Sequence, residues 1–237
     1  MSDKLTNVTF NKDTMDLIGE LGAINSQIIV EKDEKKQNIL ISRKNPATTI
    51  AYIFKAPVDH FNFNGDNIAF YNFPEFYQMI SCFDQPTIKQ NSNKIIVSQG
   101  SAKINYVLTD AETLKKGPGK VNFSGPDATI NLPSDELKEL EKMIGLFGAL
   151  GVELTVKDNS VVVKVFNDDY DNSFQKEYKS VGKNKSNFSL KISSEVFVLL
   201  PKEDYNLEIK KEGIVRFSFN KNGTELDLFT AELEEND

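Results

Sequence analysis

The chain has 237 residues, of which 39% are hydrophobic, and a net charge of −7 at pH 7. This length fits one large domain or two of ordinary size, each able to bury a core, and no apolar run approaches the roughly 18 residues that a membrane-spanning helix needs. The acidic balance excludes a protein that holds nucleic acid by bulk charge, because such proteins are normally basic. If a chain of this composition binds DNA, it needs a local basic surface to do so.

The first half of the chain predicts many short strands and two helices. Asn11 is a favoured N-cap residue, and the apolar residues Met15, Ile18 and Leu21 then recur at helical spacing. Apolar and polar residues alternate through 103–108, as in a half-buried antiparallel strand. In chain order we expect a strand at 8–10, a helix at 12–24, strands at 27–31, 38–43, 48–55 and 67–71, a helix at 74–83, and strands at 86–91, 94–98 and 102–109.

The second half has a similar pattern. Pro133, Ser134 and two acidic residues form a strong helix start, in which Ser134 is expected to cap the helix. Pro201 stops a second, shorter helix. In chain order we expect a strand at 128–132, a helix at 134–149, strands at 152–157, 160–166, 173–180 and 186–191, a helix at 194–200, and strands at 205–210, 214–220 and 224–231.

The order of elements is therefore the same in both halves. The helix starts at 13 and 134 differ by 121 residues, as do those at 73 and 194, while the strand residues Ile88 and Leu207 differ by 119. A fixed offset of this kind is the signature of an internal repeat. The sequence predicts two copies of an α+β domain with two helices and antiparallel sheets. We expect a first domain at 1–110, a Gly- and Pro-rich connector at 111–127 and a second domain at 128–237.

Short stretches of the sequence add a resemblance to a known family. Lys12-Asp13-Thr14, together with 23–28, resembles the opening of the DNA sliding clamps of T-even bacteriophages. The stretch 132–137 resembles the start of the second-domain helix in clamps generally, including the eukaryotic and archaeal proliferating cell nuclear antigens. The closing region of the phage clamps is similar to three residues here, Pro201, Tyr205 and Leu207. In the order of its elements, the resemblance covers nearly the whole chain.

The resemblance implies the DNA-clamp fold and the function of a processivity factor, with no active site, no cofactor and no metal. Six domains close into a ring, so two domains per chain imply a homotrimer around double-stranded DNA. An ATP-dependent clamp loader places the ring, and the ring tethers the replicative DNA polymerase. The phage type implies the cytoplasm of an infected bacterial host cell and no membrane, and it leaves open a role in late transcription.

The resemblance also implies a DNA-facing surface. Helices line the central hole of such a ring, and basic groups on or beside them are expected to face DNA. These residues are Lys12, Lys138, Lys142, Lys191 and Lys202. The alternative is that they are solvated lysines, with Lys138 and Lys142 paired to the neighbouring Glu139 or Glu141.

Two further surfaces are expected. Exposed sheet edges invite pairing, so the edge strands 102–109 and 173–180 are expected to join subunits through Tyr106, Leu108, Phe174, Lys176 and Tyr178. A groove beneath the connector is expected to receive an apolar partner peptide, with the acidic run Glu234-Glu235 as its rim. The groove residues are Leu114, Val121, Phe123, Phe229 and Leu233. The alternative is that Leu114 and Phe123 only pin the connector to the sheet.

Nothing in the sequence resembles a nucleophile–base pair or a metal cluster, so we do not expect an enzyme. His60, the only histidine, is expected to have a structural role, and Cys82, the only cysteine, to lie in the core. Two other functions stay open. A β-rich virion or scaffold protein would explain the duplicated strands without DNA, and a single-strand nucleic-acid-binding module would use Phe-rich strands for stacking. Neither predicts a helix pair repeated in each half.

Overall fold

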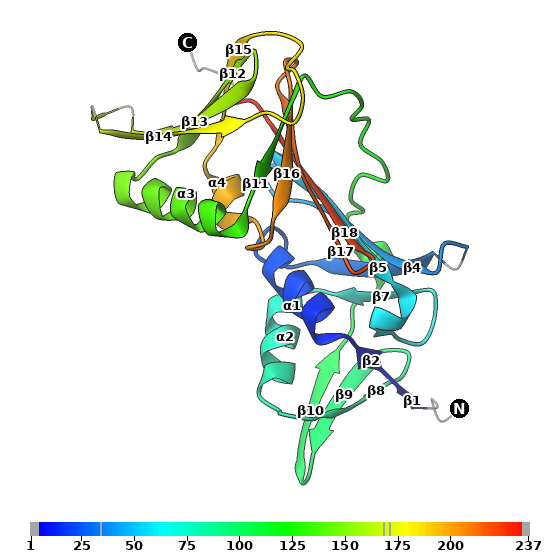
Figure 1. Ribbon diagram of the computed structural model, residues 1–237. Coiled ribbons are helices and arrows are strands. Elements are labelled where there is room, and N and C mark those ends of the chain that lie inside the picture. The colour runs from blue at the N-terminus through cyan, green and yellow to red at the C-terminus, as the bar shows by residue number, and fades with distance from the viewer. Residues whose placement is uncertain (1–4, 34, 168, 171, 234–237) are drawn as a thin grey trace. The chain divides into compact units, whose positions relative to one another are not determined.

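The computed structural model describes residues 5–33, 35–167, 169–170 and 172–233 (Figure 1). The chain divides into two compact units. Unit 1 comprises Met1–Pro46, Tyr52–Gly119 and Lys221–Glu225, and unit 2 comprises Ala47–Ala51, Lys120–Asn220 and Leu226–Asp237. The main division thus falls within the stretch that the sequence analysis assigns to the connector.

Unit 1 contains the first set of helices and strands. Its helices are α1 (Lys12–Leu21) and α2 (Phe73–Ser81). Its strands are β1 (Thr6–Asn7), β2 (Thr9–Phe10), β3 (Ile28–Asp33), β4 (Asn38–Lys44), β5 (Ile50–Pro57, of which residues from Tyr52 on belong to this unit), β6 (Phe61–Asn62), β7 (Asn67–Phe70), β8 (Thr87–Gln90), β9 (Lys94–Gln99) and β10 (Ala102–Val107). The 3-10 turns η1 (Val58–His60) and η2 (Ala111–Thr113) complete it.

Unit 2 contains the second set. Its helices are α3 (Ser134–Phe147) and α4 (Glu195–Leu199). Its strands are β11 (Ala128–Leu132), β12 (Gly151–Lys157), β13 (Ser160–Phe166), β14 (Ser173–Lys179), β15 (Phe188–Ser193), β16 (Tyr205–Lys210), β17 (Ile214–Lys221, of which residues up to Asn220 belong to this unit) and β18 (Thr224–Ala231, of which residues from Leu226 on belong to this unit).

The two units share one topology. In unit 1 the strands are ordered β1-β8-β9-β10 and β5-β4-β3-β7, and in unit 2 they are ordered β11-β16-β17-β18 and β14-β13-β12-β15. Each of these orders in unit 1 has its counterpart in unit 2, with the helices at equivalent points of the chain. In each unit the two helices lie side by side (Figure 1). The structure therefore confirms the α+β class and the duplicated domain that the sequence predicts.

The helices of unit 1 approach each other closely because glycine faces the contact. A Cβ added at Gly19 would lie 3.0 Å from the Tyr77 ring, and one at Gly22 would lie 2.9 Å from Pro74. The Tyr77 hydroxyl donates a 2.6 Å hydrogen bond to Oδ1 of Asp16 on α1. This hydrogen bond, with burial, raises the pKa of Tyr77 to about 12. The start of α1 is as predicted, because Asn11 Oδ1 accepts from the backbone N–H of Thr14 at 3.1 Å.

An aromatic cluster fills the core of unit 1. Phe70 is fully buried, and its ring lies 4.7 Å from that of Phe76, 5.0 Å from that of Phe73 and 6.0 Å from that of Tyr106, centroid to centroid. The Phe61 ring stacks on that of Phe70 at 6.5 Å, centroid to centroid. Burial of a Phe side chain stabilises a fold by about 1.5–3 kcal/mol, so this cluster joins α2, β7 and β10 into one packed body.

Candidate DNA-facing surface and subunit edges

Helix α3 presents the two lysines on which the DNA-facing prediction chiefly depends. Its buried stripe is Leu137, Leu140 and Ile144, as predicted. The prediction that Ser134 caps the helix is wrong, because Ser134 is already the first helical residue and the Pro133 N-cap makes no side-chain hydrogen bond. Instead Asp204, 70 residues away, accepts from the Ser134 N–H at 2.8 Å.

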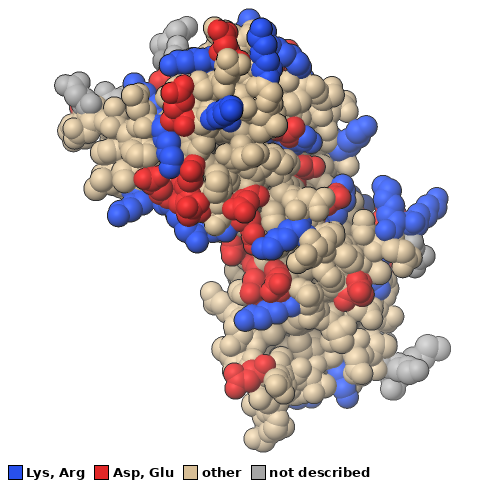
Figure 2. Space-filling model, viewed as in Figure 1, with Lys and Arg blue, Asp and Glu red and all other residues tan. Residues whose placement is uncertain are grey.

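Lys138 and Lys142 are exposed and lie on one face of α3, one turn apart. In the part of the chain that the structure describes, neither lies within ion-pair distance of a carboxylate, and Glu139 and Glu141 pair instead with Lys176 and Lys202. The two lysines line a shallow, charged hollow with three acidic residues and a strand lysine: Asp135, Glu136, Glu139 and Lys176. Figure 2 shows acidic and basic groups mixed over α3.

Lys176 belongs to this hollow rather than to an outward-facing edge. Its ammonium lies 2.9 Å from Glu139 and 3.4 Å from Glu136, and the hydrogen bond to Glu139 raises its pKa. On β14, Lys176 pairs with the buried Val163 of β13. Since opposite residues share a face, Phe174, Lys176 and Tyr178 all face α3. Burial raises the pKa of Tyr178.

The other three expected DNA-facing lysines have different surroundings. Lys12 is exposed at the first residue of α1. Lys202 donates to the Phe197, Val198 and Leu200 carbonyl oxygens at the end of α4 and lies 3.3 Å from Glu141, which fixes it between α3 and α4.

Lys191 does not share the helix surface, which corrects its assignment. On β15 it pairs with Glu153, and its neighbours Leu190 and Ile192 point into the core. Its ammonium lies 4.9 Å from the centroid of the Phe166 ring, on the sheet face opposite α3. The alternation of apolar and polar residues along a strand predicts that the strand has two different faces. It does not predict which of the two faces the helices pack against.

The two strands expected to join subunits, β10 and β14, each end a sheet. Among the described residues β10 pairs only with β9, and β14 only with β13. The Leu108 N–H donates to Asn93 O next to β9, and the Ser180 N–H donates to Asn159 O next to β13. Because N–H directions alternate along a strand, the N–H groups of the odd-numbered residues 103–107 and 173–179 point to the open edges.

The expected interface side chains divide into two groups. Tyr106 and Tyr178 are buried in their own units, and the Tyr106 hydroxyl donates to Asn72 O at 3.0 Å. Leu108 and Phe174 are half-buried. Val107, which is not among the expected interface residues, is 72% exposed at the end of β10. Its position on the polar side of an alternating strand was the only available signal.

The expected groove residues are largely covered by their own units. Leu114 is buried in unit 1 against Ile29 and Ala69, which supports the pinning alternative for this residue. In unit 2 the Phe123 ring lies 6.0 Å from the Phe229 ring and 4.8 Å from the Arg216 guanidinium. Val121 is half-buried.

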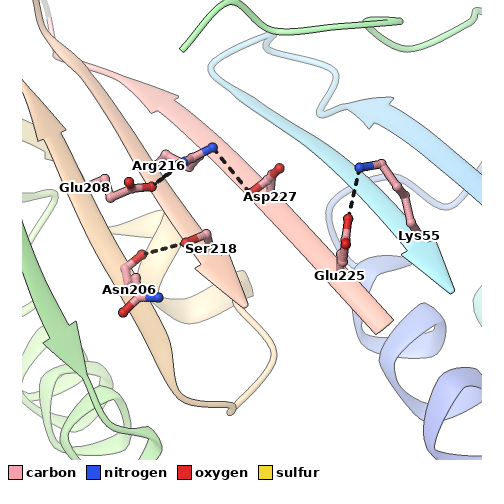
Figure 3. Close-up of polar contacts among 7 residues, drawn as sticks. All are labelled: Lys55, Asn206, Glu208, Arg216, Ser218, Glu225 and Asp227. Atoms are coloured by element: carbon pink, nitrogen blue, oxygen red, sulfur yellow. Dashed lines mark hydrogen bonds and ion pairs between the residues drawn. The ribbon is translucent and has the colours of Figure 1, made fainter. Parts of the chain in front are cut away.

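Phe123 packs on the polar face of β16, β17 and β18. Arg216 on β17 forms ion pairs with Glu208 on β16 and with Asp227 on β18, the latter at 3.8 Å, and Figure 3 shows the row they form. These ion pairs position the guanidinium that makes the cation–π contact with the Phe123 ring. Leu233 lies apart, because its N–H donates to Lys191 O on β15. Glu234 and Glu235, the expected acidic rim, lie outside the described residues.

The last residues considered for a chemical role are His60 and Cys82. The His60 ring lies 3.0 Å (Nδ1) from the Thr14 hydroxyl, beside α1. Cys82 is exposed, so its assignment to the core is wrong; α2 ends at Ser81, one residue earlier. Within the described residues, no three His, Cys, Asp or Glu side chains gather as a metal site. None of the helices described is long and apolar enough to cross a membrane.

No protein-family model and no curated protein matches the chain. Solved structures do. The chain is similar to A. fulgidus proliferating cell nuclear antigen bound to the C-terminal region of FEN-1, with 12% identity, a TM-score of 0.77 and coverage of 98% of this chain and 100% of that one. It is also similar to the Entamoeba histolytica antigen, with 11% identity, a TM-score of 0.76 and coverage of 99% and 100%. The chain therefore has the DNA-clamp fold of the proliferating cell nuclear antigens.

Proposed function

We propose that this chain is one subunit of a DNA sliding clamp, which encircles duplex DNA and tethers the replicative polymerase without catalysing a reaction. The observation that carries the proposal is the repeated topology, in which β10 of unit 1 and β14 of unit 2 each end a sheet, on a fold shared with clamps over 98% of the chain. A chain with two different open edges can pair head to tail, and such pairing gives a closed ring when the rotation allows it.

A homotrimer of six domains is the ring that we propose, closed by β10 of one chain against β14 of the next. The N–H groups that point outward belong to odd-numbered residues in both strands. They allow antiparallel registers in which an odd-numbered residue of β10 lies opposite an odd-numbered residue of β14. The register with Lys103 opposite Glu177 also places Val107 opposite Ser173, whereas a shift by two residues would place Lys103 opposite Lys179. Opposite charges directly across a strand pair are stabilising and like charges destabilising, so charge favours the first register over this shifted one.

Retention on DNA is expected to be topological. Loaded by an ATP-dependent clamp loader, the protein should remain on nicked circular DNA through gel filtration and leave after the circle is cut. Changing both Lys138 and Lys142 to Glu should reduce loading without unfolding, because both side chains are exposed. Equal retention on circular and linear DNA would contradict enclosure.

The groove proposal concerns polymerase tethering through an apolar peptide. Phe123→Ala should abolish polymerase stimulation, measured as synthesis length, because it removes the ring between Phe229 and Arg216. The trimer mass should not change. Lys120→Ala, in the same connector, is the matched control. Unaffected stimulation, or loss of folding, would favour simple pinning of the connector.

The T-even phage type, the cytoplasm of an infected bacterium and a role in late transcription stay predictions from the sequence resemblance. The alternative of a single-strand binding module has less support from the structure. Stacking platforms need exposed aromatic rings, and among the described residues Tyr71 and Tyr170 are the exposed aromatic side chains, while the phenylalanines are at least half-buried.

A further inference from the structure

Only two of the 28 basic residues of this chain are arginines, Arg43 and Arg216, and the structure gives them opposite surroundings. Arg216 forms ion pairs with Glu208 and Asp227. Arg43 lies near the end of β4 in unit 1 and is 2% exposed, and among the described residues no carboxylate lies within ion-pair distance of it. Because an arginine side chain keeps its charge in proteins, Arg43 is a buried positive charge without a negative charge in contact.

The beginning of the connector covers Arg43. Its Nη1 donates a hydrogen bond to the backbone oxygen of Lys115, and the neighbouring Ser42 Oγ donates to the Pro118 oxygen at 2.5 Å. A Cβ added at Gly117 would collide with the backbone of Ser42 and Arg43. The guanidinium of Arg43 thus lies beneath connector residues 115–118.

The other two guanidinium nitrogens of Arg43 lack acceptors. Nε and Nη2 are buried, and neither has a hydrogen-bond partner among the described residues. The hydroxyl of Tyr52, on the neighbouring strand β5, is also buried there without a partner. Burial raises the pKa of Tyr52, and the charge of Arg43 opposes this rise. Since buried donors without acceptors are costly, and a buried charge more so, these donors favour an acceptor that carries negative charge.

Glu31 does not supply that acceptor. Burial lowers the pKa of Arg43, and the charges of Tyr52 and Glu31 oppose this shift. The Glu31 side chain is 43% exposed, however, and its Oε1 lies 3.6 Å from Nζ of Lys116 in the connector. Glu31 therefore attracts Arg43 from a distance and leaves its Nε and Nη2 unsatisfied.

We propose that unit 1 binds a carboxylate at Nε and Nη2 of Arg43, beneath connector residues 115–118. These two N–H groups lie parallel on one side of the guanidinium and match the two oxygens of a carboxylate. One carboxylate also neutralises one arginine. A phosphate group, with about −1.5 to −2 charges, would leave buried negative charge, and chloride offers one atom to two donors. The inference does not rest on the clamp function, because every residue used belongs to unit 1.

Nitrogen-15 NMR of the full-length protein tests the site, because two arginines give two Nε–H signals. Arg216 Nε already donates to a Glu208 oxygen, so its signal is an internal reference. Sodium formate should move the Arg43 signal toward that of Arg216 in a saturable way. Sodium chloride and sodium phosphate at the same ionic strength should leave the signal in place. An equal shift with chloride, or a larger one with phosphate, would overturn the carboxylate assignment.

Arg43→Met provides the matched variant for thermal unfolding. Replacing a buried charge with an apolar side chain of similar volume is often neutral or stabilising, so this variant should fold. Formate should raise the melting temperature of the unmodified protein more than chloride does, because it binds the folded state. The difference should disappear in Arg43→Met and in Arg43→Lys, which keeps the charge without the fork. Lys44→Met, at the exposed neighbour, should retain it. A formate effect of the same size in Arg43→Met would overturn the site.

A second probe distinguishes the sources of the carboxylate. N-acetyl-aspartate N-methylamide carries the same group on a peptide backbone. A shift of the Arg43 signal by this probe as well as by formate would assign the site to an acidic residue of a partner polypeptide, and a response to formate alone would assign it to a small free acid. If neither probe moves the Arg43 signal, the proposal is wrong.

Discussion

Replacing Glu177 with proline should convert the trimer into monomers. The Glu177 N–H points to the open edge of β14, since the Ser180 N–H points to the β13 side. Proline removes that donor and places its ring against the incoming strand. The Glu177 side chain is exposed and lies on the face away from α3, so the substitution should leave the core of unit 2 packed. Light scattering should report the mass of one 26.7 kDa chain instead of three.

Two controls isolate the backbone contribution. Glu177→Ala keeps the N–H. It loses the exposed hydrogen bond from Ser160 Oγ, 2.5 Å long, and the proposed ion pair with Lys103, worth about 0–1 kcal/mol, so the trimer should persist at micromolar concentration. Lys103→Glu should weaken the ring by opposing two carboxylates, and Lys103→Glu with Glu177→Lys should restore it. An unchanged trimer in Glu177→Pro, with circular dichroism showing a folded protein, would refute this pairing of β10 with β14.

Replacing Phe70 with alanine should destabilise unit 1 by about 3–5 kcal/mol, the usual cost of removing a buried aromatic side chain. Phe70 is fully buried with four aromatic rings around it, so the neighbours cannot close the cavity without disturbing α2 and β10. A loss of this size is a large fraction of the 5–15 kcal/mol that typically stabilises a domain. Urea unfolding followed by circular dichroism measures it.

The adjacent residue supplies the control. Tyr71 is 64% exposed, and Tyr71→Ala should change the free energy of unfolding by no more than about 0.5 kcal/mol. Because Tyr106 of β10 packs on Phe70, Phe70→Ala should also lower the trimer fraction at low protein concentration. A loss below about 1 kcal/mol for Phe70→Ala would mean that the cluster repacks and does not support the edge strand.

The sequence by itself determined the elements and their duplication. Helical spacing, the Asn11 cap and strand alternation are local signals, because they depend on residues within a few positions of each other. The repeated order of elements then depends only on counting along the chain. These signals located all four helices to within about three residues at each end, which is the usual uncertainty for boundaries. The short strand β6 and both 3-10 turns had no such signal.

Only the tertiary structure decided which side of each element meets which partner. Alternation placed Lys176 and Lys191 on faces of strands, but the packing of α3 on one face of the sheet decided that Lys176 pairs with Glu139 and that Lys191 lies on the opposite face. The cap of α3 came from Asp204, and burial of Leu114 came from Ile29 and Ala69. Such contacts join residues tens of positions apart, and their geometry is set by how layers stack rather than by the spacing of neighbouring residues.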